Sequence, residues 1–158
     1  MKKIFFLVGC LFIYSFTEES FILDPTRPIE IGVTSIDNNS NYLLSVYMIN
    51  HQPVSGIQLD LEPQNFFIVD TVYGGRAEKN GFSLHYNKSG RILGFSLSGS
   101  VIPESKSLNK EDNILFEVLA APLSNTSLLN TSITIIPIFA DGKAQRIDYI
   151  SIPFEIGK

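Results

Sequence analysis

The chain has 158 residues, of which 44% are apolar and 18% charged, with twelve Lys and Arg against sixteen Asp and Glu. This length suits one domain that can bury a core, and the composition argues against an intrinsically disordered chain. The net charge is −4 and no basic run is longer than Lys2-Lys3, so nucleic acid is a poor partner.

The first seventeen residues have the pattern of an export signal. Lys2 and Lys3 precede a largely apolar run at 4–16. A helix of this length spans roughly 20 Å against the roughly 30 Å of a membrane core, which favours a cleaved signal at 1–17 over a permanent span. We therefore expect an exported protein, extracellular or at the cell surface. A polar tether is predicted at 18–28, before a domain at 29–156.

Cys10 is the only cysteine, and it ends the sequence Leu7-Val8-Gly9-Cys10, which resembles a bacterial lipobox. In a lipobox the cysteine is lipidated and becomes N-terminal after cleavage, which would make the protein a lipoprotein of the cell surface or outer membrane. The alternative is an ordinary signal peptide with an incidental thiol. In both cases the folded part has no cysteine, which excludes a disulfide framework and a cysteine nucleophile.

Beyond the tether, apolar and polar residues alternate as in strands that are buried on one face. Predicted strands cover 29–34, 42–49, 57–62, 66–73, 82–86, 91–97, 114–119, 132–140 and 145–154. Gly and Asn at the boundaries, as in Asn80-Gly81, tolerate the positive φ of tight turns. The regular spacing of the strands and the lack of a helical period predict an all-β sandwich.

Few residues suit catalysis or metal binding. His51 is predicted in a turn and His85 on a strand, and neither has a second ligand near it in the sequence. Asp60 and Glu62 share one strand face, but nothing beside them in the sequence supplies a cleft. The segment 94–98 lacks the second Gly of a G-x-S-x-G nucleophile elbow. We expect no enzyme, no metal site and no cofactor.

Several fragments, taken in order, resemble a cohesin domain. They are residues 54–61, Gly75-Arg76, 91–99 with Ile102-Pro103, and 114–118. The resemblance extends over 29–155 and depends on V-x-G-I/F-Q-x-D-L followed by R-I/V-L-G-F-S-L-S-G. It is nearer to the cohesin-like modules of exported bacterial proteins than to those of cellulosome scaffolds. The chain departs from the family at 106–112, which is polar and charged where a Gly-rich turn is common.

The resemblance implies a jelly-roll-like antiparallel β-sandwich of about nine strands that binds a dockerin module on one flat sheet face. It also implies a non-catalytic module without a cofactor, because the calcium belongs to the dockerin partner. Carbohydrate-binding modules share this fold, so polysaccharide binding is the alternative. Sugar rings stack on exposed aromatic side chains, but the chain has no Trp, and only Tyr42 and Tyr73 are candidates for loop positions.

Side-chain parity predicts which residues form the docking face. We expect Leu93, Phe95 and Leu97 to point inward, so that the small residues between them point outward and form a flat strip. The predicted partner-binding residues are Gln58, Asp60, Glu62, His85, Gly94, Ser96, Ser98 and Glu117. Outward Ile92, Leu115 and Leu119 would supply the apolar part of the face. The alternative is a sandwich whose second face is covered by a loop or by the N-terminal segment.

Overall fold

The computed structural model describes residues 22–37, 42–64, 66–123 and 131–156. The predicted signal peptide at 1–17, the lipidation of Cys10 and the first residues of the tether lie outside these ranges. No helix of the described part is long and apolar enough to cross a membrane.

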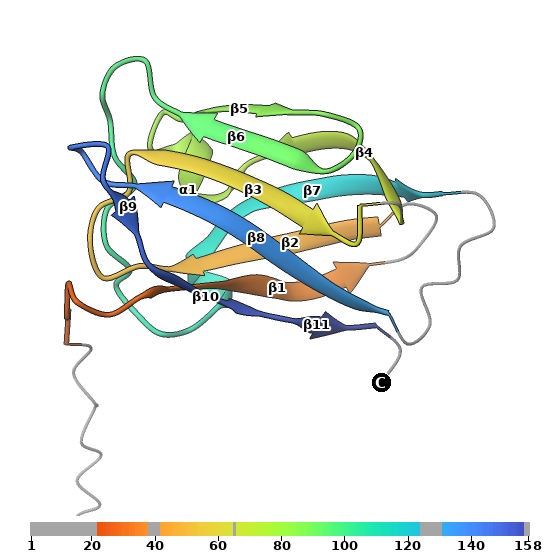
Figure 1. Cartoon of the computed structure of the whole chain (residues 1–158), viewed down its shortest axis with the longest axis horizontal. Helices are drawn as coiled ribbons and strands as arrows, with labels where there is room; N and C mark the ends of the chain where they lie inside the picture. The colour runs from red at the N-terminus through yellow and green to blue at the C-terminus, as the bar shows by residue number, and fades with distance from the viewer. Residues whose placement is uncertain (1–21, 38–41, 65, 124–130, 157–158) are drawn as a thin grey trace, which may run out of the picture.

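Two β-sheets pack face to face as a sandwich (Figure 1). One sheet has five strands in the order β10-β1-β2-β7-β4, and the other has six in the order β11-β8-β3-β6-β5, with β9 also paired to β8. The strands are β1 (Ile29–Asp37), β2 (Tyr42–Ile49), β3 (Gly56–Glu62), β4 (Phe67–Tyr73), β5 (Ser83–Tyr86), β6 (Arg91–Phe95), β7 (Ile114–Pro122), β8 (Ser132–Ala140), β9 (Arg146–Ile147), β10 (Tyr149–Ile152) and β11 (Phe154–Glu155). The predicted all-β sandwich is confirmed.

The last predicted strand, 145–154, is three strands in the structure. β9 and β11 pair with the two ends of β8, and between them β10 crosses to the other sheet and pairs with β1. The β1–β10 pair is parallel, whereas the other ladders are antiparallel. Because β10 pairs with β1 in the other sheet, the middle of β8 is paired on one side with β3. On its other side it has no partner among the described strands.

One short helix, α1 (Gly75–Lys79), follows β4, and one 3-10 turn, η1 (Glu111–Asn113), precedes β7. A Cβ on Gly75 would lie 2.3 Å from the Leu115 carbonyl oxygen, and Gly75 has φ 63°. Glycine is therefore required for α1 to approach β7 this closely. A helix of five residues is too short to show its period in the sequence.

The core lies between the sheets and follows the alternation of the strands. On β3, Ile57, Leu59 and Leu61 are buried, and the residues between them are half-buried on the outer side. They pack in one cluster with inward residues of the other sheet, such as Val46 and Phe116. Each sheet thus has one face in the core, and a partner could reach only the two outer faces.

Candidate functional site

The outer face of the five-stranded sheet is partly covered by α1 and by the segment 103–113. Tyr47 of β2 lies on this face, since a Cβ on Gly32 would come within 2.9 Å of its ring. Yet Tyr47 is 0% exposed, because Lys110 of the covering segment lies over it with Nζ 4.8 Å from the ring centre. Burial, together with a 2.8 Å hydrogen bond from the Tyr47 hydroxyl to Glu30, raises the pKa of Tyr47. The part of this face around Tyr47 is therefore closed.

The outer face of the six-stranded sheet is open and carries apolar side chains. We call it the open face, and it consists of the outward residues of β8, β3, β6 and β5. Leu93 and Phe95 of β6 are each 39% exposed, and Ile136 and Ile138 of β8 are 47% and 44% exposed. In the register of the sheet, Gln58 of β3 lies between Leu93 and Ile138. The four apolar side chains thus flank β3 from both sides.

Polar groups surround this apolar centre. Asp60 accepts two hydrogen bonds from Arg91, Nε to Oδ1 at 2.7 Å and Nη2 to Oδ2 at 3.0 Å. This hydrogen bonding, with the charge of Asp60, raises the pKa of Arg91. The His85 ring stacks on Phe95 at 5.3 Å between centroids and 9° between planes. An apolar centre with a polar rim is the arrangement of protein–protein interfaces.

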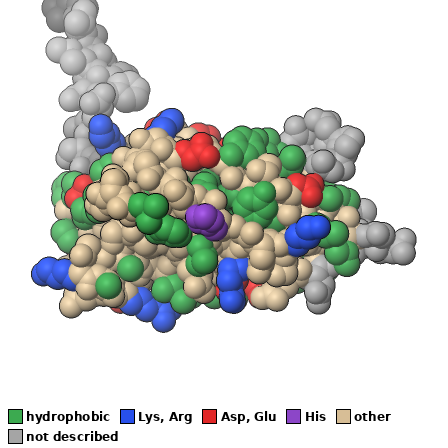
Figure 2. All heavy atoms as spheres, turned by 90° about the horizontal axis from the view of Figure 1, so that it is seen from above, with side chains coloured by type: hydrophobic (Ala, Val, Ile, Leu, Met, Phe, Trp, Pro, Cys, Tyr) green, Lys and Arg blue, Asp and Glu red, His purple; other side chains and the backbone are tan. Residues whose placement is uncertain are grey.

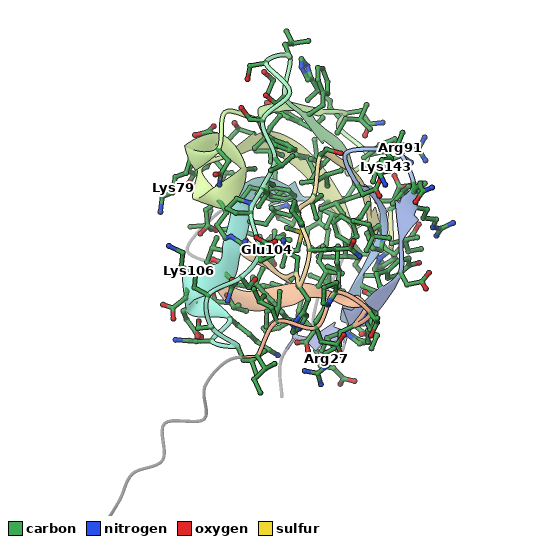
Figure 3. The ribbon with its side chains drawn as sticks, turned by 90° about the vertical axis from the view of Figure 1, so that its left-hand side faces the viewer. Arg27, Lys79, Arg91, Glu104, Lys106 and Lys143 are labelled. Atoms are coloured by element: carbon green, nitrogen blue, oxygen red, sulfur yellow. The ribbon has the colours of Figure 1, made fainter. Side chains whose placement is uncertain are left out.

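The figures show how the two sides differ. In Figure 3, α1 with Lys79 and the segment with Lys106 lie on one side of the sandwich, and Arg91 and Lys143 lie on the other. Figure 2 looks onto the side of β5 and β6, where hydrophobic side chains gather around the exposed histidine. Arg91, which bonds to Asp60 on the open face, thus lies on the side of the sandwich away from α1.

Four of the predicted binding residues lie on the open face. Gln58, Asp60 and Glu62 project outward from β3, and His85 is exposed on β5. They come together because β3 and β5 both pair with β6.

The predicted parity of β6 was wrong. Ile92 is 0% exposed and Gly94 is buried, with an ideal Cβ on Gly94 only 3.2 Å from Leu84 Cδ2. Arg91 explains the reversal, since it shares the parity of Leu93 and Phe95. Burying those two side chains would carry the guanidinium into the core, and an unpaired buried charge is costly.

Ser96 and Ser98 lie beyond the end of β6 rather than on the flat sheet. Their hydroxyls form a chain with Ser100, with 2.9 Å between neighbouring Oγ atoms. Between them, Leu97 is 89% exposed. The predicted flat strip of small residues is therefore replaced by a polar turn with one projecting apolar side chain, at the border of the open face.

The placement of Glu117 on this face was also wrong. Glu117 is on β7, in the other sheet, opposite Ser45 of β2 and Tyr73 of β4. Of the predicted apolar neighbours, Leu115 is 0% exposed and Leu119 is half-buried. The register shift between β2 and β7 near Leu115, and the close approach of α1, explain the burial of Leu115.

The apolar centre itself was not predicted from the sequence. Its members are Leu93, Phe95, Ile136 and Ile138. A signal was present in β8, where both parities carry apolar residues, as in the neighbouring pairs Ile135-Ile136 and Ile138-Phe139. A strand that is apolar on both faces predicts an outer face that is either covered or used for binding.

The histidines and carboxylates do not gather into a metal site. In the described ranges no group of three or more His, Cys, Asp or Glu could hold a metal ion. His51 is buried beside the tether, and its Nδ1 accepts a 3.3 Å hydrogen bond from the Asp24 amide. Hydrogen bonds from Thr26 lower the pKa of Asp24.

Two solved structures that are similar to this fold are cohesins. The sixth cohesin of Acetivibrio cellulolyticus scaffoldin B, solved in complex with a mutant dockerin, has a TM-score of 0.52 at 9% identity, over 78% of this chain and 94% of that one. A non-cellulosomal cohesin of the hyperthermophilic archaeon Archaeoglobus fulgidus has a TM-score of 0.54 at 19% identity, over 82% and 91%. No protein-family model and no curated protein matches the sequence.

The fold is thus a jelly-roll-like β-sandwich. More specifically, the chain has a cohesin-like fold, in agreement with the resemblance of its sequence.

Proposed function

We propose that this protein is a non-catalytic binding module whose open face docks a dockerin-type module of another exported protein. One observation carries the proposal: the apolar centre of the six-stranded sheet is exposed, while the opposite face is partly covered. The solved cohesin of Acetivibrio cellulolyticus in complex with a dockerin indicates the class of partner. The calcium of the complex would belong to the partner.

The chemistry of the open face supports docking rather than catalysis. Leu93, Phe95, Ile136 and Ile138 offer a surface that a helix of a partner can cover, and such apolar anchors dominate interface energies. Asp60 is engaged by Arg91 through two hydrogen bonds, so its carboxylate is not poised as a base or nucleophile. The pair would sit at the rim of the interface, where charge determines orientation and specificity more than affinity.

The proposed location follows from the N-terminal sequence. A signal peptide at 1–17 would export the domain, and lipidation of Cys10 would hold it at a membrane surface. β1 begins at Ile29, directly after the predicted tether. A lipid-anchored or secreted module would meet a partner that is also outside the cell.

Polysaccharide binding is the alternative outcome of the test. The two candidate tyrosines do not form one platform. Tyr42 packs edge-on against Phe67, the first residue of β4, with 5.9 Å between the ring centroids. Tyr73, which is 42% exposed, is the last residue of that strand. On the open face, the Phe95 ring is already stacked with His85.

The experiment is a calorimetric titration of the protein with dockerin modules encoded in the same genome, in calcium and in EDTA. We expect calcium-dependent binding that Ile138→Asp weakens by at least about 100-fold, since a charge would be buried in the apolar centre. Ile150→Asp is the matched control, because Ile150 is 51% exposed on the sheet that carries the covering segment. Retention on insoluble polysaccharide, with no dockerin bound, would refute the proposal.

A further inference from the structure

The segment Pro103–Asn113, which we call the strap, crosses the outer face of the five-stranded sheet, and both of its ends meet at Arg76 of α1. Arg76 donates to Pro103 O at 2.6 Å and Ser105 Oγ at 3.0 Å near the start of the strap, and to Asn113 Oδ1 at 3.1 Å at its end. The same guanidinium donates to Met48 O at 2.8 Å and to Asn50 Oδ1 at 2.9 Å. One side chain therefore ties both ends of the strap to the end of β2.

The strap is held by polar contacts rather than by apolar burial. Its buried residues are Ser105 and Asn113, and its one large apolar side chain, Leu108, is 57% exposed. Asn113 Nδ2 donates to Ser107 O at 2.9 Å and to Asn109 O at 2.7 Å, which fixes the strap internally. The strap thus has its own hydrogen bonds but adds few side chains to the core.

Open space borders the strap on two sides. A hollow of about 300 Å³ lies between Arg76 and residues of the strap, including Lys106 and Asp112. A second hollow of about 550 Å³ is lined by Leu108 and Lys110 and by Ile49 of β2. Beneath the strap, Tyr47 and Ile49 are only 0% and 4% exposed. The strap therefore has hollows beside it while it shields the Tyr47 ring and Ile49.

We infer that the strap is a cover that opens as a unit over Tyr47 and Ile49, and that Arg76 is the positioning residue that holds it closed. Segments with few buried apolar contacts open locally, at lower free energy than global unfolding requires. The carbonyl and amide acceptors of Arg76 are neutral, so the guanidinium contributes charge-assisted hydrogen bonds to the closed state. Asn50 also bonds to Ser105 and to Pro103 O, and Lys110 lies 3.7 Å from Glu30, but Arg76 is the side chain that bonds to both ends of the strap. Burial lowers the pKa of Arg76 to about 10, which leaves it charged at neutral pH.

This inference goes beyond docking on the open face and does not depend on it. It assigns to the opposite sheet an apolar surface that becomes accessible only when the strap opens. With the strap closed, the Tyr47 ring and Ile49 are shielded; with the strap open, both become accessible to solvent.

Amide hydrogen exchange on the full-length protein tests the inference without any partner. The reporters are the amides of Ser105, bonded to Asn50 O at 2.8 Å, and Asn113, bonded to Lys110 O at 3.0 Å. Arg76→Lys keeps the charge but loses the planar fork, and we expect exchange at both reporters to rise by about 10- to 100-fold. Exchange in the core strands β3 and β6 should stay unchanged. Lys79→Gln, on the exposed side of the same helix, is the control and should change exchange neither at the two reporters nor in β3 and β6.

Unchanged exchange at the reporters, or an equal rise in all strands, would overturn the inference. A measurement on the wild type covers the case in which Arg76→Lys does not fold. In low denaturant, the reporter amides should exchange by openings that expose less surface than global unfolding. If they exchange only together with the core of β3 and β6, the strap does not open as a unit.

Discussion

Leu97→Ala should separate affinity from stability, because Leu97 is 89% exposed in the free protein. It follows Phe95 by two residues, at the border of the open face. Full burial of a Leu side chain is worth about 1.5–3 kcal/mol, so covering the part now exposed would contribute about 1.3–2.7 kcal/mol to docking. The variant should therefore bind a dockerin roughly 10- to 100-fold more weakly.

The same estimate predicts almost no cost in folding. The small part of Leu97 that is already buried is worth about 0.2–0.3 kcal/mol. Isothermal titration calorimetry measures the affinity, and urea denaturation measures the free energy of unfolding. Leu108→Ala is the matched control, since Leu108 is 57% exposed but lies on the strap. Unchanged affinity for Leu97→Ala would refute docking at this border, and a loss of stability above about 1 kcal/mol would show that the side chain packs in the core.

Three further predictions test the face, the covered tyrosine and the export signal. Gly94→Val should lower the free energy of unfolding by about 1–3 kcal/mol, because the new side chain points into the core. Gly142→Val is the control and should change the free energy of unfolding little, since a Cβ there has open space around it. Equal effects of the two substitutions would show that Gly94 faces outward. Tyr47, whose pKa is raised by burial and by its bond to Glu30, should ionise above the ordinary tyrosine pKa of about 10 in an ultraviolet titration, as a phase that Tyr47→Phe removes. Its contribution to stability is full below the unfolded pKa of about 10 and falls as the pH rises further, so a Tyr47 that ionises with the rest would contradict the buried geometry. Cys10→Ser should abolish lipid labelling, and unchanged processing to an N-terminus near residue 18 would establish an ordinary signal peptide instead.

Strand positions could be predicted from the sequence where local patterns decide them. β2 and β8 have the predicted bounds, and the strict alternation of β3 placed Gln58, Asp60 and Glu62 on the outer side. In β6 the local pattern was misleading, because Leu93 and Phe95 outweigh Ile92 in a count of apolar residues. The opposing signal was local as well, since Arg91 shares the parity of Leu93 and Phe95, and only its partner, Asp60 of β3, comes from a neighbouring strand.

The error at Glu117 has a different origin. Its outward parity on β7 was a local inference, but which sheet a strand joins depends on the order of pairing along the whole chain. β7 follows β6 in the sequence yet lies between β2 and β4, in the opposite sheet. Likewise, the covering of Tyr47 by Lys110 depends on the path of the long connection between β6 and β7.

The gap in pairing along the middle of β8 bears on solubility. Leu61 donates its N–H to Gly90 O, on the β6 side of β3. Two residues earlier, the backbone N–H and C=O of Leu59 point to the same side, because these groups alternate along a strand. Pro137, opposite Leu59, therefore turns its nitrogen away from β3, toward the side of β8 that β9 and β11 leave unpaired. A bare strand edge beside exposed Ile136 and Ile138 would invite strands of other copies and lead to aggregation. A proline has no N–H to donate to such a strand. The protein can therefore expose an apolar face without a strand edge beside it that is fully able to pair with another copy.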